Sequence, residues 1–211
     1  MILAVASCLS LAVSASAAST ARKATDFRDF DKSAWYAEAV SAAVDNGLLY
    51  GKSATIIDPD GDMTRAEMAA IINRSFGCYA KADISKYKDV SKDKWYFEDV
   101  AMAVQMGTYN GRSNTAMVPD APITRQEAMT VVARALELDY DSYAKTDLSK
   151  FSDRDKISTW ALPYVRAMVG ADYIHGRGKI LAPQDNITRA EFAQIFHNII
   201  GSYITVKGSY D

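Results

Sequence analysis

The residue with the clearest chemical potential in this sequence is an arginine that occurs three times in one short phrase. Thr-Arg-x-Glu recurs at residues 64–67, 124–127 and 188–191, at offsets of 60 and 64 residues. Its threonine and glutamate match a capping box, in which each side chain bonds the other residue's backbone N–H at the start of a helix. The six expected caps are Thr64, Glu67, Thr124, Glu127, Thr188 and Glu191. Capping leaves the arginine unexplained.

The three arginines, Arg65, Arg125 and Arg189, would occupy the first turn of their helices. Free backbone N–H groups and the positive end of the helix dipole make this an unfavourable place for a cation, so its repetition indicates an anion nearby. A guanidinium beside free amides suits a carboxylate or a phosphate. The alternative is an ion pair with an aspartate of a neighbouring copy, such as Asp29, Asp89 or Asp153. Spacing alone leaves both interpretations open.

The tryptophans of the chain share this register. Trp35, Trp95 and Trp160 precede the threonines of the phrases by 28 or 29 residues. A tryptophan near the start of an amphipathic helix is a common core residue, whereas an exposed ring could stack on a sugar. The core interpretation is favoured, and the sugar-binding interpretation stays open.

Each copy contains the elements that would position these residues. In the first copy, residues 35–44 place apolar side chains at helical spacing and end near Gly47, a helix C-cap. A loop with Gly and Pro follows, and its apolar residues Ile57, Met117 and Leu181 in the three copies are expected to anchor it to the core. A second apolar stripe follows each phrase. The pattern predicts a mainly α fold of three helix-loop-helix repeats, and units of ~60 residues are marginal alone, so the three should pack as one body.

Composition and the chain's beginning limit the possible partners. With 24 basic and 26 acidic residues, the chain has no overall field for nucleic acid. Residues 1–17 have the apolar composition and small-residue ending of a signal peptide, too short for a membrane span, so export is expected. The three repeats are placed at 23–85, 86–146 and 147–208.

Catalysis and metal binding find little support in the sequence. The acidic run from Asp58 to Asp62 lacks the glycine that a calcium loop needs at its sixth position, where Met63 stands. His175 and His197 have no ligand cluster at metal spacing. We therefore expect no enzyme activity, no metal and no cofactor, and three copies of one phrase favour multivalent binding.

These residues resemble the S-layer homology domain family. The hallmarks are an aromatic-x-Asp start, a tryptophan, a Gly- and Pro-containing loop and the Thr-Arg-Ala-Glu phrase, present in three tandem copies. The resemblance implies a pseudo-threefold, three-pronged body that anchors bacterial surface proteins to secondary cell-wall polymers, often through a pyruvylated amino sugar. It also implies that Arg65, Arg125 and Arg189 are principal ligand residues. The loops at Gly51, Gly111 and Gly176 would shape the binding grooves.

Departures from the family pattern affect the number of working grooves. Gln126 stands where alanine is usual, Thr108 replaces an apolar residue, and Asp172 replaces a glycine. Because all three arginines remain, at least two competent grooves are expected. The alternatives are anchoring to modified peptidoglycan, as in some relatives, or a structural protein that assembles with itself, with cargo or with S-layer proteins. An enzyme acting on wall glycan is the least favoured.

Overall fold

The computed structural model describes residues 22–207 and is helical over this range. The expected signal peptide, residues 1–17, lies outside the described residues. Six α-helices carry the fold, with two short 3₁₀ helices and isolated β-bridges in place of strands across the described part. The α-helices are α1 (Ala37–Asp45), α2 (Arg65–Phe76), α3 (Phe97–Gln105), α4 (Arg125–Ala135), α5 (Leu162–Gly170) and α6 (Arg189–Lys207). The 3₁₀ helices are η2 (Ala24–Asp26) and η3 (Arg154–Lys156). The expectation of a mainly α protein is confirmed.

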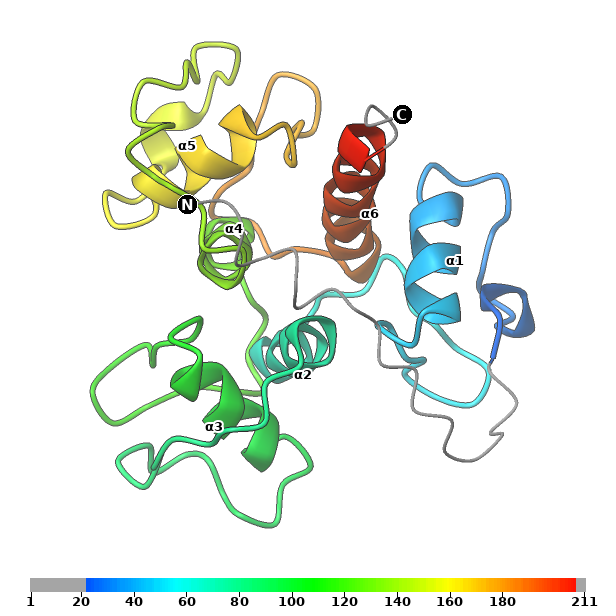
Figure 1. Ribbon diagram of the computed structural model, residues 1–211. Coiled ribbons are helices and arrows are strands. Elements are labelled where there is room, and N and C mark those ends of the chain that lie inside the picture. The colour runs from blue at the N-terminus through cyan, green and yellow to red at the C-terminus, as the bar shows by residue number, and fades with distance from the viewer. Residues whose placement is uncertain (1–21, 208–211) are drawn as a thin grey trace.

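The six helices form three arms around a common centre (Figure 1). The second helices of the repeats, α2, α4 and α6, surround the centre, and α1, α3 and α5 stand outside them. Within each arm the packing joins neighbouring repeats, because α3 packs on α2, α5 on α4 and α1 on α6. The last arm therefore joins the two ends of the described chain and closes the arrangement into a ring.

A small ring of backbone hydrogen bonds lies where the three repeats meet. Met63 N–H donates to Ile187 O, Ile187 N–H to Ile123 O and Ile123 N–H to Met63 O, each at 3.0 Å. These three residues each immediately precede the cap threonine of their phrase, and their side chains are fully buried. The ring places the three helix N-termini around one apolar hub.

The aspartates of the aromatic-x-Asp elements hold the long loops. Asp89 carboxylate oxygens accept from the N–H groups of Met117 (2.9 Å) and Val118 (2.6 Å). Asp29 and Asp153 bind their own loops in the same way. Ile57, Met117 and Leu181 are fully buried, so their expected role as loop anchors is confirmed. Each loop is consequently held at two adjacent residues, the first of which is also buried in the core.

The first helix of each repeat ends with a residue in the left-handed conformation. Gly47 and Gly107 have φ values of 67° and 73°, and Asp172, which replaces glycine in the third copy, has φ 62°. Aspartate tolerates this conformation better than most side chains. The third copy therefore keeps the same turn despite the departure.

Candidate functional site

The backbone N–H groups at the starts of α2, α4 and α6 are already bonded. Arg65 N–H donates to Ala121 O (3.0 Å) and Ala66 N–H to Pro119 O (2.9 Å), both in the loop of the second repeat. The third repeat's loop covers α4 in the same way, and the first repeat's loop covers α6. The expectation of free amides waiting for a ligand anion is therefore wrong. Each loop folds over the preceding repeat's second helix and supplies carbonyl oxygens to its first turn.

The capping geometry of the phrases accounts for the next donors. Thr124 Oγ1 accepts from Glu127 N–H (3.4 Å), and Thr124 N–H donates to Glu127 Oε2 (2.9 Å). The pair at Thr64 and Glu67 has the same two bonds. The pair at Thr188 and Glu191 repeats them. In each capping pair one carboxylate oxygen of the glutamate accepts from the threonine N–H, and the other oxygen remains available to a cation.

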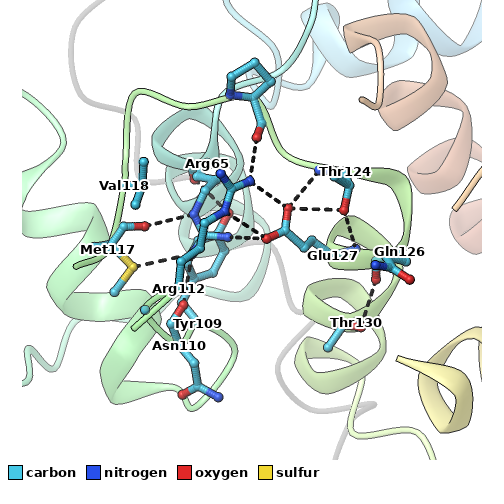
Figure 2. Close-up of polar contacts among 12 residues, drawn as sticks. Arg65, Tyr109, Asn110, Arg112, Met117, Val118, Thr124, Gln126, Glu127 and Thr130 are labelled. Carbon is cyan, nitrogen blue, oxygen red and sulfur yellow. Dashed lines mark hydrogen bonds and ion pairs between the residues drawn. The ribbon is translucent and has the colours of Figure 1, made fainter. Parts of the chain in front are cut away.

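That cation is the arginine of the preceding repeat. Arg65 is 4% exposed, and its Nη1 donates to Glu127 Oε1 at 3.1 Å. Nε donates to Met117 O and Nη2 to Asn110 O, both at 2.9 Å, so the guanidinium is fixed by the second repeat's loop (Figure 2). The Tyr109 ring packs against the guanidinium, with its centre 5.1 Å from the guanidinium carbon, and the Tyr109 hydroxyl donates to Arg65 O.

The same pairing runs around the molecule. Arg125 Nη1 lies 2.9 Å from Glu191 Oε1, and Arg189 Nη1 lies 3.4 Å from Glu67 Oε1. Each arginine thus meets the glutamate of the next repeat, and the third meets the first. The expectation that each arginine forms an ion pair with a neighbouring repeat is confirmed, but the expected partners are wrong. Asp29, Asp89 and Asp153 bind the loops instead. The anion at each helix start is a cap glutamate of the chain itself.

A second cation reaches each cap glutamate, and the sequence reasoning missed it. Arg112 donates from Nε and Nη2 to Glu127, at 3.2 and 3.1 Å. Lys52 lies 2.6 Å from Glu67, and Arg177 lies 2.6 Å from Glu191. These residues directly follow Gly51, Gly111 and Gly176, and a basic residue after each aligned glycine is the signal that could have identified them.

The cap glutamates are held as anions. Burial alone would raise the pKa of Glu127, but hydrogen bonds from Arg112 and the Thr124 N–H, with the charge of Arg65, lower it below the ordinary value. Glu67 and Glu191 have lowered pKa values for the corresponding reasons. Each carboxylate therefore stays charged between two cations.

Two of these clusters open into cavities that draw on all three repeats. The Arg65 groove, of about 390 Å³, contains Arg65 of repeat one, Arg112, Glu127 and Arg134 of repeat two and Trp160 of repeat three. The Arg125 groove, of about 320 Å³, contains Arg125 of repeat two, His175, Arg177 and Glu191 of repeat three and Trp35 of repeat one. Neither groove exists within a single repeat.

The tryptophans lie at the surface. Trp35, Trp95 and Trp160 are 62%, 63% and 52% exposed, so the favoured core interpretation is wrong. Helix α1 begins at Ala37, after Trp35, and it is the next residue, Tyr36, that is buried at 6% exposure. The indole rings of Trp35 and Trp160 line the Arg125 and Arg65 grooves, respectively, from a neighbouring repeat.

The glycines of the loops are required for close packing. A Cβ at Gly111 would lie 2.5 Å from Tyr87 Cε1 and from Ser113 O. Gly51 meets Phe27, and Gly176 meets Phe151, at similarly short distances. Gly111 and Gly176 also line the two grooves. They let each loop lie against the aromatic ring that begins its repeat, which sets the groove wall.

The other departures from the family pattern are accommodated. Gln126 Nε2 donates to Ser158 Oγ (3.0 Å), and its Oε1 accepts from Ser158 N–H, which joins α4 to the third repeat. Thr108 is buried and its hydroxyl donates to Ala103 O at 3.0 Å. Both polar residues therefore have partners in the packed structure.

Within residues 22–207, no cluster of three or more His, Cys, Asp or Glu side chains has the geometry to hold a metal ion. None of the helices described over the same range combines the length and apolar character of a membrane span.

The chain belongs to the S-layer homology domain family. The family model matches residues 26–69, 86–129 and 150–193, one match in each repeat. The resemblance noted from the sequence is therefore confirmed.

Curated relatives include surface-layer and anchoring proteins. The chain is 34% identical over 194 residues to the surface-layer 125 kDa protein of Lysinibacillus sphaericus. The matched region covers 90% of this chain and 16% of that protein. It is 28% identical over 153 residues to a cellulosome-anchoring protein of Acetivibrio thermocellus, covering 68% of this chain and 33% of that protein.

An exoglucanase, XynX of Acetivibrio thermocellus, is 28% identical over 182 residues, or 16% of its length. The chain thus spans about a sixth of the surface-layer protein and of the exoglucanase. Because the match lies in the S-layer homology region, the enzyme name describes a much longer protein and does not apply to this domain.

Proposed function

We propose that this chain is a non-catalytic, exported module that anchors a protein to the bacterial cell surface by binding an acidic, pyruvylated secondary cell-wall polymer in grooves between its repeats. The observation that carries the proposal is the pair of guanidiniums around one carboxylate in the Arg65 and Arg125 grooves. An exposed tryptophan lies beside each cluster, and in the Arg65 groove the cations outnumber the carboxylate. A sugar with a carboxylate matches both features.

Arg65 has one donor left for such a ligand. A guanidinium has five N–H donors, and the bonds from Arg65 to Met117 O, Met117 Sδ, Asn110 O and Glu127 use four of them, which leaves one on Nη1. Arg112 is 38% exposed at its side chain and stands at the groove rim. In this proposal Arg65 is a fixed inner contact and Arg112 is the outer one, and Arg125 and Arg177 have these roles in the second groove.

Co-sedimentation with purified cell walls tests the proposal. Wild-type protein should pellet with intact walls and stay in solution with walls stripped of their secondary polymer. Equal binding to stripped walls would indicate peptidoglycan as the target. Concentration-dependent assembly without any wall binding would indicate a structural protein that binds itself or other surface proteins.

Two sets of variants separate ligand contact from folding. Replacing the loop cations together (Lys52→Gln, Arg112→Gln, Arg177→Gln) should abolish wall binding while the helical circular dichroism is retained. Replacing the three buried arginines by lysine keeps the charge but removes the planar fork, and should weaken both binding and stability. Full wall binding by the loop-cation variant would overturn the proposed site.

A further inference from the structure

The two grooves differ in their balance of charge. The Arg65 groove adds a third guanidinium, Arg134, which is half-buried on α4. Its Nη2 donates to the Tyr164 hydroxyl at 3.1 Å, and its guanidinium carbon lies 4.7 Å from the Tyr164 ring centre. Among the described residues Arg134 forms no ion pair. The aligned residue in the Arg125 groove is Asn198, which is uncharged.

The Arg125 groove carries one more carboxylate. Asp185 Oδ2 accepts from Arg177 Nη1 at 2.8 Å, so Arg177 is shared between Asp185 and Glu191. The residue aligned with Asp185 in the second repeat is Ala121, which leaves Arg112 with Glu127 alone. His175 Nε2 of the same groove lies 3.2 Å from Asp172 Oδ1, so this side chain already has a carboxylate partner.

The local charges follow from these contacts. Three guanidiniums and one carboxylate surround the Arg65 groove, whereas two guanidiniums and two carboxylates surround the Arg125 groove. Asp185 forms an ion pair with the Arg177 guanidinium, which a ligand carboxylate would otherwise contact. An anionic ligand must displace that internal carboxylate in one groove and finds an unpaired cation in the other.

We propose that the Arg65 groove is the primary site for the acidic sugar, that Arg134 is a ligand-binding residue, and that Asp185 is an internal competitor that weakens the Arg125 groove. This inference rests on the proposed function. It predicts unequal affinities within one pseudo-threefold body, set by the residues at positions 134 and 185.

The tryptophans provide a separate reporter for each groove. Trp160 lines the Arg65 groove and Trp35 lines the Arg125 groove, and both are exposed. Their indole N–H signals can be followed by ¹H–¹⁵N correlation spectra and assigned with Trp→Phe variants. The titrant is the methyl glycoside of a pyruvylated N-acetylhexosamine.

In the wild-type protein the Trp160 signal should titrate at about tenfold lower ligand concentration than the Trp35 signal. Arg134→Gln should raise the midpoint at Trp160 by about tenfold or more, as expected for the loss of one charge-assisted hydrogen bond, and leave Trp35 unchanged. Asp185→Ala, which copies Ala121, should lower the midpoint at Trp35 by a similar factor. Glu98→Ala removes the same charge from a remote surface pair with Lys81 and should move neither midpoint.

Equal midpoints in the wild-type protein, or no gain at Trp35 in Asp185→Ala, would overturn the inference while leaving the proposed function intact. The absence of any ligand-dependent shift, together with no sedimentation on intact walls, would instead overturn the proposed function.

Discussion

Arg65 and Glu127 belong to different copies of the same phrase and form an ion pair across the boundary between repeats, with Nη1 and Oε1 3.1 Å apart. The side chains are 5% and 16% exposed. Glu127 therefore caps its own helix and also fixes the preceding repeat. Because the equivalent pairs link the second repeat to the third and the third to the first, loss of one pair affects the whole body.

Replacing Glu127 by Gln should destabilise the protein by about 2 kcal/mol, because the buried Arg65 loses its charged partner. Urea unfolding followed by circular dichroism measures the change. The matched control is Glu98→Gln, which breaks the exposed pair with Lys81 and should change stability by less than about 0.5 kcal/mol. Equal effects of the two substitutions would contradict the importance of the inter-repeat pair.

Stability should fall in acid. The folded pKa values of Glu67, Glu127 and Glu191 are lowered from 4.5, so between the two values the unfolded chain binds more protons than the folded one. The stabilisation is fully present above pH 4.5 and is lost as the pH falls through the lowered folded values. Urea midpoints measured from pH 7 to pH 3 should show this loss. A flat profile would contradict it, and Glu127→Gln should show a shallower decline than wild type.

Gly111→Ala should distort the Arg65 groove, because a Cβ there would lie 2.5 Å from both Tyr87 and a loop carbonyl. We expect a loss of stability of about 1–3 kcal/mol and a weaker Trp160 response to ligand. Gly178→Asn is the control, since Gly178 has φ +65°, which asparagine tolerates, and open space around it. If Gly111→Ala is as mild as this control, the loop has more freedom than its contacts indicate.

Trp160→Ala should weaken wall binding without weakening the fold. The ring is 52% exposed, so its removal should change the free energy of unfolding by less than about 1 kcal/mol. Wall sedimentation and urea unfolding, measured on the same preparation, separate the two effects. A large loss of stability would show instead that the ring supports the arm on which it stands.

The helices could be predicted from sequence, and so could the starts of the second helices of the repeats, because these patterns are local. Thr124 and Glu127 are three residues apart, and their mutual bonds need no other part of the chain. The apolar loop anchors were also predictable, since an isolated apolar residue in a polar loop is stabilised by burial in the core. The three repeats could be recognised because their matching residues recur at nearly constant spacing.

The contacts between repeats could not be predicted in the same way. Which glutamate meets Arg65 depends on the path of the second loop over α2, and no sequence pattern encodes that path. The same path occupies the amides that were expected to be free. The tryptophan error had a different origin: Tyr36 lies on the buried stripe of α1, and Trp35, one residue before it, is exposed.

The packing of α1 on α6 has a consequence for how the protein is made. Helix α1 leaves the ribosome long before α6, so its apolar face has no native cover until nearly the whole described chain has been synthesised. A chain interrupted after two repeats would keep that face open and lack the third member of the hub. Incomplete molecules should therefore expose apolar surface and be degraded by proteases, and only molecules with all three arms should survive.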